Sequence, residues 1–351
     1  MSADRAKKPI QRLLVVLPTW LGDCVMATPT LRALRQVCAG GRITTLGRLN
    51  LRPIVRDLPW VDRRLVVRST RRDPVSIARR LAKGRFDAVV LLPNSFRWAA
   101  TVAMAGIPRR IGYERDGRGF LLTDRLLPLR NERGFVPVPT LEYYLGLARY
   151  LGATEPTTHM ELFTRSEDEA AADALLERAG YAGGPLVLLN PGAQKDVKRW
   201  APRRFAEVAD RLAEDRDVSI AATGSPAERP VLDAVIAAAR RPVLDLATHG
   251  LNLVLLKSVL RRADLLVTND TGTRHIAAAM GTPVVTLFGP TPPEWTEIGF
   301  AKERQVIAPD RPGGPPRPRP GRPHRFMEDI PVESVLAAAT ELLDIHAGHV
   351  A

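Results

Sequence analysis

The feature that most constrains the fold of this chain is a regular alternation of short apolar runs and amphipathic helical segments. In the first half, the runs that predict buried strands lie at 13–17, 42–46, 64–67 and 88–92. The segments that predict helices lie at 25–37, 77–83 and 98–105. Apolar strands that alternate with helices are typical of a parallel sheet covered by helices on both faces.

The second half repeats this pattern. It predicts strands at 186–189, 218–222, 243–245, 265–268 and 284–287. It predicts helices at 202–212, 228–239, 253–261, 274–280 and 332–345. A length of 351 residues suits two such domains. We therefore expect an α/β fold with an N-terminal domain over 1–165 and a C-terminal domain over 185–351, joined by a linker region at 166–184.

Charge is distributed unequally between the halves. Residues 1–165 hold 29 lysines and arginines against 13 aspartates and glutamates, whereas the remainder holds 22 against 25. The basic half predicts an anionic partner, for which phosphorylated lipid, an anionic membrane face and nucleic acid all qualify. The candidate acceptor or membrane contacts are Arg63, Arg64, Arg68, Arg71, Arg72, Arg79 and Arg80, although a merely solvated face is the alternative.

Two observations bear on the compartment. The apolar run at 13–17 follows basic residues, as in a signal peptide, but it ends after five residues at Pro18 and favours a buried strand. Cys24 and Cys38 are too few for a disulfide framework and lack metal-site spacing. We therefore expect a reducing, cytoplasmic location.

The first candidate site is the loop that follows the first predicted strand and ends in Gly22 and Asp23. Ligands of open α/β sheets bind outside the carboxyl ends of the strands. Gly22 permits close approach of a ligand to the backbone. Asp23 has two interpretations: it caps the following helix, or it accepts a proton from a hydroxyl nucleophile.

A second candidate site, from Thr268 to His275, joins an apolar strand to an alanine-rich helix. A helix N-terminus offers free N–H groups and the positive end of its dipole, which suits a diphosphate. Thr271 adds a hydroxyl, Gly272 removes bulk, and His275 lies one turn into the helix. The alternative is a simple cap with a surface histidine.

Two further loops follow strands in the same half. Gly192 and Ala193 lead to Lys198, a candidate phosphate contact, while Gly224 and Ser225 precede Glu228. Glu228 suits either ribose hydroxyls or a helix cap. Three such loops at strand ends predict a nucleotide-binding cleft.

Several familiar sites are absent from the sequence. It contains no dinucleotide fingerprint, phosphate loop, nucleophile elbow or zinc pattern. The Asp215-Arg216-Asp217 triplet precedes a strand, where we expect only a solvated turn. We therefore expect a metal-independent mechanism with no cofactor. The Pro/Arg-rich segment 309–323 predicts either a mobile loop or a basic lip beside the site.

Three segments together resemble glycosyltransferase family 9, the heptosyltransferases of the lipopolysaccharide inner core. They are LLVVLPTWLGDCVMATPTLRALR, NPGA with KRWAPRRFAEVA, and VTNDTGTRHIAAAMGTPVVTLFGPT. The start of the chain and HRFMEDIPVESV near its end resemble most the heptosyltransferase II group within that family.

The resemblance implies a GT-B fold, with two Rossmann-like domains whose parallel sheets face across a cleft. It implies an acceptor in the N-terminal domain and a nucleotide sugar in the C-terminal domain. The reaction it implies is an inverting transfer from ADP-L-glycero-β-D-manno-heptose to the lipopolysaccharide core, at the inner face of the inner membrane.

Residue roles carry over by position. The resemblance implies that Asp23 is the base, that Lys198 contacts phosphate and that Leu246 lies beside the adenine. The other implied donor contacts are Gly22, Gly192, Ala193, Gly224, Ser225, Glu228, Asp270, Thr271, Gly272 and His275. Relatives often have cysteines in the segment matching 309–327, and this chain has none, so no metal or redox role is expected there.

Three other functions stay open on the sequence. A family member that uses another nucleotide sugar or acceptor would carry the same motifs. A basic nucleic-acid-binding protein is a more distant alternative, since only 5% of the residues are aromatic and stacking platforms are scarce. A catalytically silent scaffold is disfavoured by the retention of Asp23.

Overall fold

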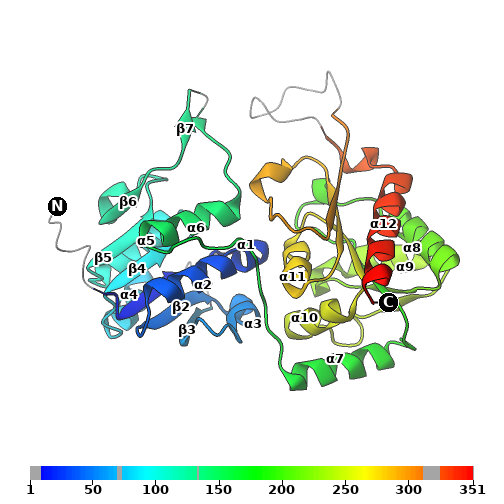
Figure 1. Cartoon of the computed structure of the whole chain (residues 1–351), viewed down its shortest axis with the longest axis horizontal. Helices are drawn as coiled ribbons and strands as arrows, with labels where there is room; N and C mark the ends of the chain where they lie inside the picture. Colours follow the sequence, from blue (N-terminus) through cyan, green and yellow to red (C-terminus); the bar gives the residue numbers. More distant parts are fainter. Residues whose placement is uncertain (1–8, 69–72, 133, 311–324, 351) are drawn as a thin grey trace. The chain divides into compact units, whose positions relative to one another are not determined.

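The computed structural model describes residues 9–68, 73–132, 134–310 and 325–350. The chain forms two compact units, shown with their elements in Figure 1. Unit 1 comprises Met1–Glu161 together with Glu294–Ile298, and unit 2 comprises Leu162–Pro293 and Gly299–Ala351. The short segment 294–298 therefore belongs to unit 1, although its sequence neighbours belong to unit 2.

Unit 1 contains a parallel six-stranded sheet of order β3-β2-β1-β4-β5-β6. The central strand is apolar and buried on both faces from Leu13 to Val16, as expected where helices cover both sides. The strands are β1 (Arg12–Val16), β2 (Arg42–Arg48), β3 (Arg63–Val67), β4 (Ala88–Leu91), β5 (Arg109–Tyr113) and β6 (Asp124–Leu126), and β7 (Arg130–Asn131) and β8 (Gly134–Phe135) form a separate hairpin.

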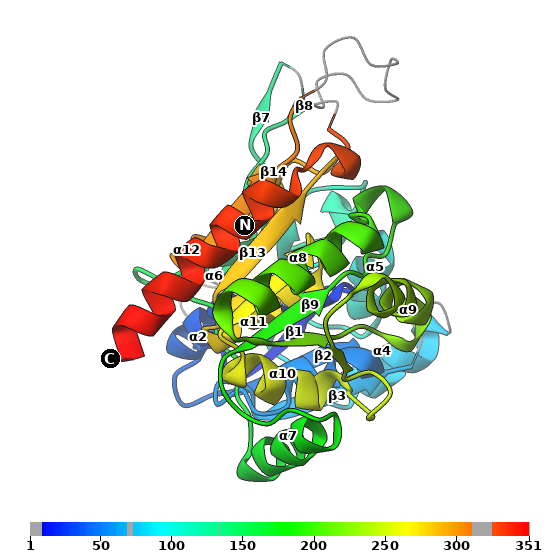
Figure 2. The ribbon, with the colours of Figure 1, turned by 90° about the vertical axis from the view of Figure 1, so that its right-hand side faces the viewer.

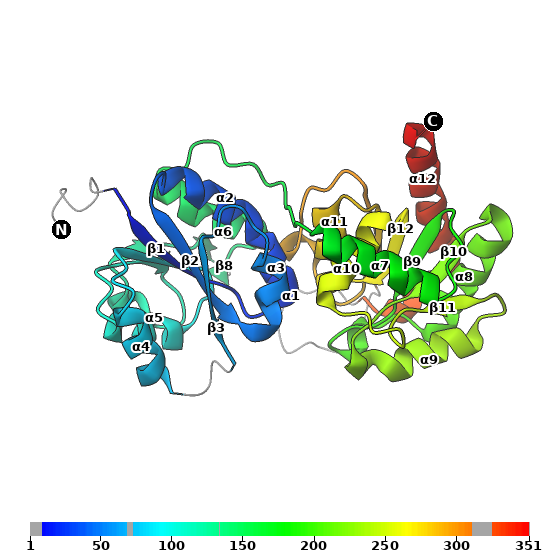
Figure 3. The same ribbon diagram turned by 90° about the horizontal axis from the view of Figure 1, so that it is seen from below.

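Helices cover both faces of this sheet. In Figure 3, α2 and α6 lie together on one side of β1 and β2, and α4 and α5 lie together on the other. The helices are α1 (Leu21–Met26), α2 (Thr28–Val37), α3 (Arg52–Val55), α4 (Pro74–Ala82), α5 (Phe96–Met104) and α6 (Thr140–Tyr150). The single helix predicted at 25–37 is instead two helices separated at Ala27, because Pro29 lacks an N–H and suits the first turn of a new helix.

Unit 2 repeats the same strand order, β11-β10-β9-β12-β13-β14, again parallel throughout. The strands are β9 (Leu186–Asn190), β10 (Ser219–Ala222), β11 (Val243–Asp245), β12 (Leu265–Asn269), β13 (Val284–Phe288) and β14 (Glu303–Ile307). The helices are α7 (Ser166–Arg178), α8 (Pro202–Arg216), α9 (Arg229–Ala238), α10 (Leu253–Arg262), α11 (Gly272–Met280) and α12 (Val332–Val350).

The apolar core of unit 2 joins the sheet to α8, α9 and α12 (Figure 2). Helix α7 packs on α10, side by side in Figures 2 and 3. The sequence placed residues 166–184 in a linker, but Ala172, Leu175 and Leu176 are buried, so α7 is part of unit 2. The boundary between the units lies between Glu161 and Leu162.

The prediction of two Rossmann-like α/β domains is confirmed: both sheets have the doubly wound order in which ligands bind where the order reverses. Strands β5, β6 and β14 were not predicted, because arginine, aspartate and glutamate break their apolar pattern. No helix within the described residues is both long and apolar enough to span a bilayer.

Candidate functional site

A pocket of about 720 Å³ lies at the carboxyl edge of the unit 1 sheet. The segments that follow β1, β4 and β6 line it, together with α6 and the segment after β8. Asp23 is one of the lining residues, half-buried in the first turn of α1. Trp20 occupies the cap position of that helix, and Asp23 lies three residues further on in its first turn.

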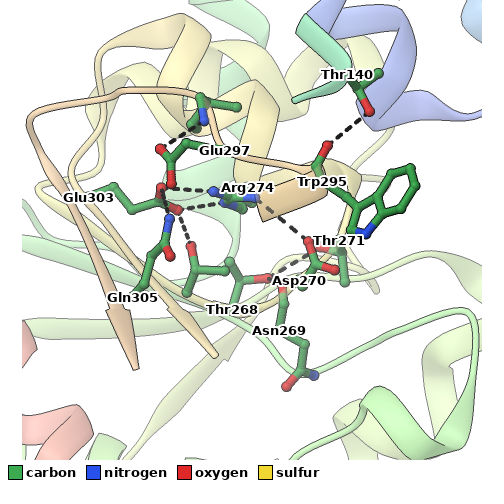
Figure 4. A network of polar contacts seen from close by, with 12 residues as sticks. Thr140, Thr268, Asn269, Asp270, Thr271, Arg274, Trp295, Glu297, Glu303 and Gln305 are labelled. Carbon is green, nitrogen blue, oxygen red and sulfur yellow. Dashed lines mark hydrogen bonds and ion pairs between the residues drawn. The ribbon is translucent and has the colours of Figure 1, made fainter. Parts of the chain in front are cut away.

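Aromatic side chains form much of the pocket wall. The rings of Tyr113 and Tyr143 stack with their centroids 3.8 Å apart and 18° between their planes. The Tyr143 hydroxyl donates to Asn94 Oδ1 at 3.1 Å. Trp295 also lines the pocket, and its carbonyl accepts a hydrogen bond of 2.9 Å from Thr140 Oγ1 (Figure 4). Aromatic rings thus make up much of the pocket wall and give it a large apolar surface with polar edges.

Two arginines, Arg115 and Arg125, line the pocket. The fully buried Arg118 donates to three lining residues, to Tyr113 O at 3.0 Å, Asn94 Oδ1 at 2.9 Å and Pro93 O. Burial lowers the pKa of Arg118, and the charge of Asp116 acts in the opposite direction. Arg115 lines the pocket and lies over the ring of Phe135 at 4.1 Å. This wall favours an anionic or strongly polar ligand.

The neighbours of Asp23 remain protonated at neutral pH. Burial, and then the negative charge of Asp23, raise the pKa of Cys24 to about 12. Burial and the negative charge of Asp23 are also the two largest causes that raise the pKa of Tyr144 well above its ordinary value. Asp23 is therefore the acidic group of this cluster, whose two other members keep their protons.

In unit 2, the three predicted loops follow the neighbouring strands β10, β9 and β12 at one edge of the sheet. Two buried asparagines join them. Asn190 donates to Thr223 O at 2.9 Å and accepts from Thr271 Oγ1 at 3.3 Å. Asn269 donates to Pro191 O at 2.8 Å and accepts from Trp200 N at 3.2 Å. No role was predicted for either asparagine from the sequence.

Asp270 pairs with two cations, Lys198 and Arg274, and Figure 4 shows the second of these pairs. Lys198 Nζ is 2.9 Å from Asp270 Oδ2, and an Arg274 terminal nitrogen is 3.7 Å from Asp270 Oδ1. The buried Arg274 makes a bidentate pair of 2.5 and 2.8 Å with Glu303, which also accepts from Thr286 Oγ1 at 2.6 Å. Lys198 is the partly exposed cation of this network.

His275 does not present a charge to a ligand. It is 3% exposed, and burial, with the positive charge of Arg274 next, lowers its pKa to about 3. The imidazole is thus neutral at physiological pH, and the alternative of a surface histidine is wrong. Lys198 and the N–H groups of Gly272 and the first turn of α11 remain the groups suited to an anion.

Glu228 takes part in a helix cap with Ser225, and it also lies next to the loop that follows β9. It accepts from Ser225 N at 2.8 Å and Ser225 Oγ at 2.7 Å. A Cβ on Gly192 would stand 2.0 Å from Glu228 Oε1, and one on Gly224 would stand 2.6 Å from Leu232 Cδ1. A side chain at either position would therefore have to displace Glu228 or Leu232.

The remaining predicted residues are placed as follows. Ala193 and Leu246 are buried in unit 2, Leu246 directly after β11. Gly22, expected with the donor residues, lies in α1 of unit 1. The described members of the arginine set do not line the unit 1 pocket: Arg63 and Arg64 are on β3, Arg68 follows it, and Arg79 and Arg80 are on α4. Arg71, Arg72 and most of segment 309–323 lie outside the described residues.

Within the described residues, no three histidine, cysteine, aspartate or glutamate side chains gather as a metal site.

Comparison with known proteins gives the family. The family model described as glycosyltransferase family 9 (heptosyltransferase) matches residues 75–318. Lipooligosaccharide heptosyltransferase 2 of Haemophilus ducreyi is 28% identical over 95% of this chain and 99% of its own length.

Solved structures give the same fold. A family 9 glycosyltransferase of Veillonella parvula superposes with a TM-score of 0.82, at 23% identity over 97% of this chain and 99% of its own. The ADP-heptose lipopolysaccharide heptosyltransferase II of Escherichia coli gives 0.79, at 24% identity over 96% and 99%. Both likenesses support the GT-B fold. Because the family model covers more than half of the chain, the protein belongs to glycosyltransferase family 9.

Proposed function

We propose that this glycosyltransferase transfers heptose from ADP-L-glycero-β-D-manno-heptose to a heptose hydroxyl of the lipopolysaccharide inner core. The observation that carries this proposal is the position of Asp23, which lines the aromatic and basic pocket of unit 1. A carboxylate beside a pocket of about 720 Å³ suits a base that meets a sugar hydroxyl. The names of the Haemophilus ducreyi and Escherichia coli relatives support the sugar and the acceptor class.

Unit 2 provides the donor site in this proposal. The diphosphate binds at the N-terminus of α11, where the Gly272 amide and Thr271 face it, and Lys198 supplies the positive charge. Glu228 accepts hydrogen bonds from the ribose, and the adenine lies beside Leu246. The loops that carry Gly192, Ala193, Gly224, Ser225 and Asp270 form the rest of the donor site.

The reaction is a single displacement with inversion. Asp23 takes the proton of the acceptor hydroxyl as its oxygen attacks the anomeric carbon, and the bond to the ADP oxygen breaks. Lys198 and the α11 amides stabilise the negative charge that develops on the departing diphosphate. These groups need no metal ion for either step.

The acceptor is a phosphorylated, membrane-anchored lipid, which we place in unit 1. The positive charge of unit 1 and the arginines of β3 and α4 favour an anionic partner over a neutral one. The protein then works at the cytoplasmic face of the inner membrane, as a peripheral protein.

A thermal-shift titration with ADP, UDP and GDP tests the donor assignment. Ligands that bind the native state raise its melting temperature by mass action. We expect ADP to give the largest rise, unchanged by chelator, and Lys198→Ala to reduce it. A larger rise with UDP or GDP, or no rise with any nucleotide, would contradict the donor assignment.

A further inference from the structure

The most exposed apolar side chains of unit 1 gather in one short stretch. Phe120 is 73% exposed, Leu127 76% and Leu129 65%. Phe120 lies on the turn after β5, and the two leucines follow β6. Large apolar side chains exposed in a group are typical of interaction surfaces, whereas single ones are common on any protein.

Contacts within unit 1 hold this stretch together. The ring of Phe120 lies 6.0 Å from that of Phe96, which is also exposed, at the start of α5. Glu114 joins the two segments: its N–H donates to Leu126 O at 2.8 Å, and its carboxylate lies against Gly119. These contacts bring together the segments that carry Phe96, Phe120, Leu127 and Leu129, and these four exposed side chains are named here the apolar rim.

Arginines accompany the apolar rim along the chain. Residues 96–135 contain eight arginines against four acidic residues, of which Arg118 is buried and Arg109 pairs with Asp124. Arg125, which pairs with Glu114 at 3.6 Å, is exposed two residues before Leu127. Arg130 is exposed directly after Leu129, with its guanidinium 4.3 Å from the ring of Phe135. Exposed phenylalanine and leucine beside arginine are the composition by which a protein surface enters the headgroup region of an anionic bilayer.

The arginines on β3 and α4, called here the arginine face, have few exposed apolar side chains beside them. Among the described residues of these two elements, Val75 is the exposed large hydrophobic side chain. That face can attract an anionic membrane at a distance but offers little surface to insert.

We propose that the apolar rim docks unit 1 on an anionic phospholipid bilayer by inserting Phe96, Phe120, Leu127 and Leu129 among the headgroups. Leu127 and Leu129 also line the pocket that contains Asp23, so docking brings the pocket to the membrane surface. The inference rests on the membrane placement in the proposed function and names the surface that docks, but it does not depend on the proposed donor or base.

Vesicle cosedimentation tests the proposal. The full-length protein is mixed with vesicles of phosphatidylcholine alone or of phosphatidylcholine with phosphatidylglycerol. We expect the wild type to bind the anionic vesicles. We expect the triple variant Phe120→Ser/Leu127→Ser/Leu129→Ser to bind them at least about tenfold more weakly, since burial of even one such side chain in the membrane strengthens binding by about that factor. Exposed positions tolerate such changes without loss of the fold, which circular dichroism verifies.

Two control variants separate the rim from other causes. Met104→Ser removes an exposed apolar side chain at the other end of α5, and we expect it to bind vesicles as the wild type does. Arg79→Gln/Arg80→Gln removes charge from α4, and we expect a smaller loss than in the triple variant. A greater loss in the α4 variant would overturn the rim as the docking surface.

Site-specific labelling locates the inserted surface directly. Cys24 and Cys38 are both fully buried, so a cysteine introduced at Leu127→Cys is the accessible thiol for an environment-sensitive dye. We expect its emission to rise and shift to the blue with anionic vesicles, and the same dye at Met104→Cys to stay unchanged. Equal responses at both positions would contradict the proposal.

Self-association is the competing use of an exposed apolar surface. If the wild type forms a concentration-dependent dimer that the triple variant loses, while vesicle binding is equal in both, the rim is a protein interface and the proposal is wrong. These vesicle measurements require no transfer activity. A negative vesicle result would therefore not contradict the proposed donor or base, and a negative transfer assay would not contradict the docking surface.

Discussion

At the scale of single residues, Asp23 is the group on which the proposed chemistry depends. Its carboxylate lines the unit 1 pocket, and its neighbours Cys24 and Tyr144 hold their protons at neutral pH. An ordinary aspartate, with a pKa of about 3.9, is a weak base. Exclusion of water around the bound acceptor would raise that pKa and strengthen the base.

We therefore predict that Asp23→Asn lowers turnover by roughly 10²–10⁴-fold, the usual contribution of general base catalysis. ADP affinity should change little, because the proposed nucleotide site lies in unit 2. Steady-state kinetics and calorimetry with ADP measure the two effects. Asp116→Asn, which removes an exposed carboxylate of the same unit, is the control. Near-normal turnover of Asp23→Asn would exclude the base role.

His275 makes the stability of unit 2 depend on pH. Its folded pKa of about 3 lies below the unfolded value of 6.5, so between these values the unfolded state binds the extra proton. The free energy of unfolding should fall as the pH drops below 6.5, by up to about 1.4 kcal/mol per pH unit. Urea unfolding from pH 7 to 5 tests this, and an unchanged slope in His275→Gln would refute it.

Some of these residue roles were visible in the sequence and others were not. Asp270 and Lys198 follow apolar strands, where ligand-binding loops are expected, and the structure pairs them at 2.9 Å. Trp295 carried no such signal: its carbonyl bonds to Thr140, 155 residues away. A contact so distant along the chain leaves no local pattern.

At the scale of elements, the ion pair between Arg274 of α11 and Glu303 of β14 holds the first turn of α11 against the sheet. Both side chains are almost completely buried and make two hydrogen bonds to each other. Arg274 also approaches Asp270, so the pair holds the end of β12 in place.

We predict that Arg274→Met destabilises unit 2 by about 3–5 kcal/mol, because it leaves a buried carboxylate unpaired. The double variant Arg274→Met/Glu303→Leu should recover much of this loss. Arg304→Gln, which breaks the exposed pair with Glu341, should cost about 1 kcal/mol or less. Denaturant unfolding gives all three values, and equal losses in the three variants would contradict the account.

The predictability of elements follows from burial. Strands β1, β9 and β12 are apolar along their length because helices cover both faces, so the sequence predicts them. Strands β5 and β14 carry charged residues whose partners are distant: Arg109 bonds to Asp124 at 2.9 Å, and Glu303 to Arg274. Local periodicity does not show that such charges are paired.

At the scale of the whole molecule, one doubly wound plan occurs twice with different surfaces. Both sheets have the same strand order, but unit 1 carries the excess of positive charge and the aromatic pocket. Unit 2 carries the loops suited to a diphosphate. This division of labour agrees with the membership of the chain in glycosyltransferase family 9.

The most direct test of the central claim is a transfer assay with ADP-L-glycero-β-D-manno-heptose and a lipopolysaccharide inner-core acceptor that ends in heptose. Mass spectrometry follows the acceptor, with chelator present and with UDP- and GDP-sugars in parallel. We predict the gain of one heptosyl residue from the ADP donor alone, without added metal. An acceptor that stays unchanged with ADP-heptose, or that gains a sugar from another nucleotide, would contradict the account.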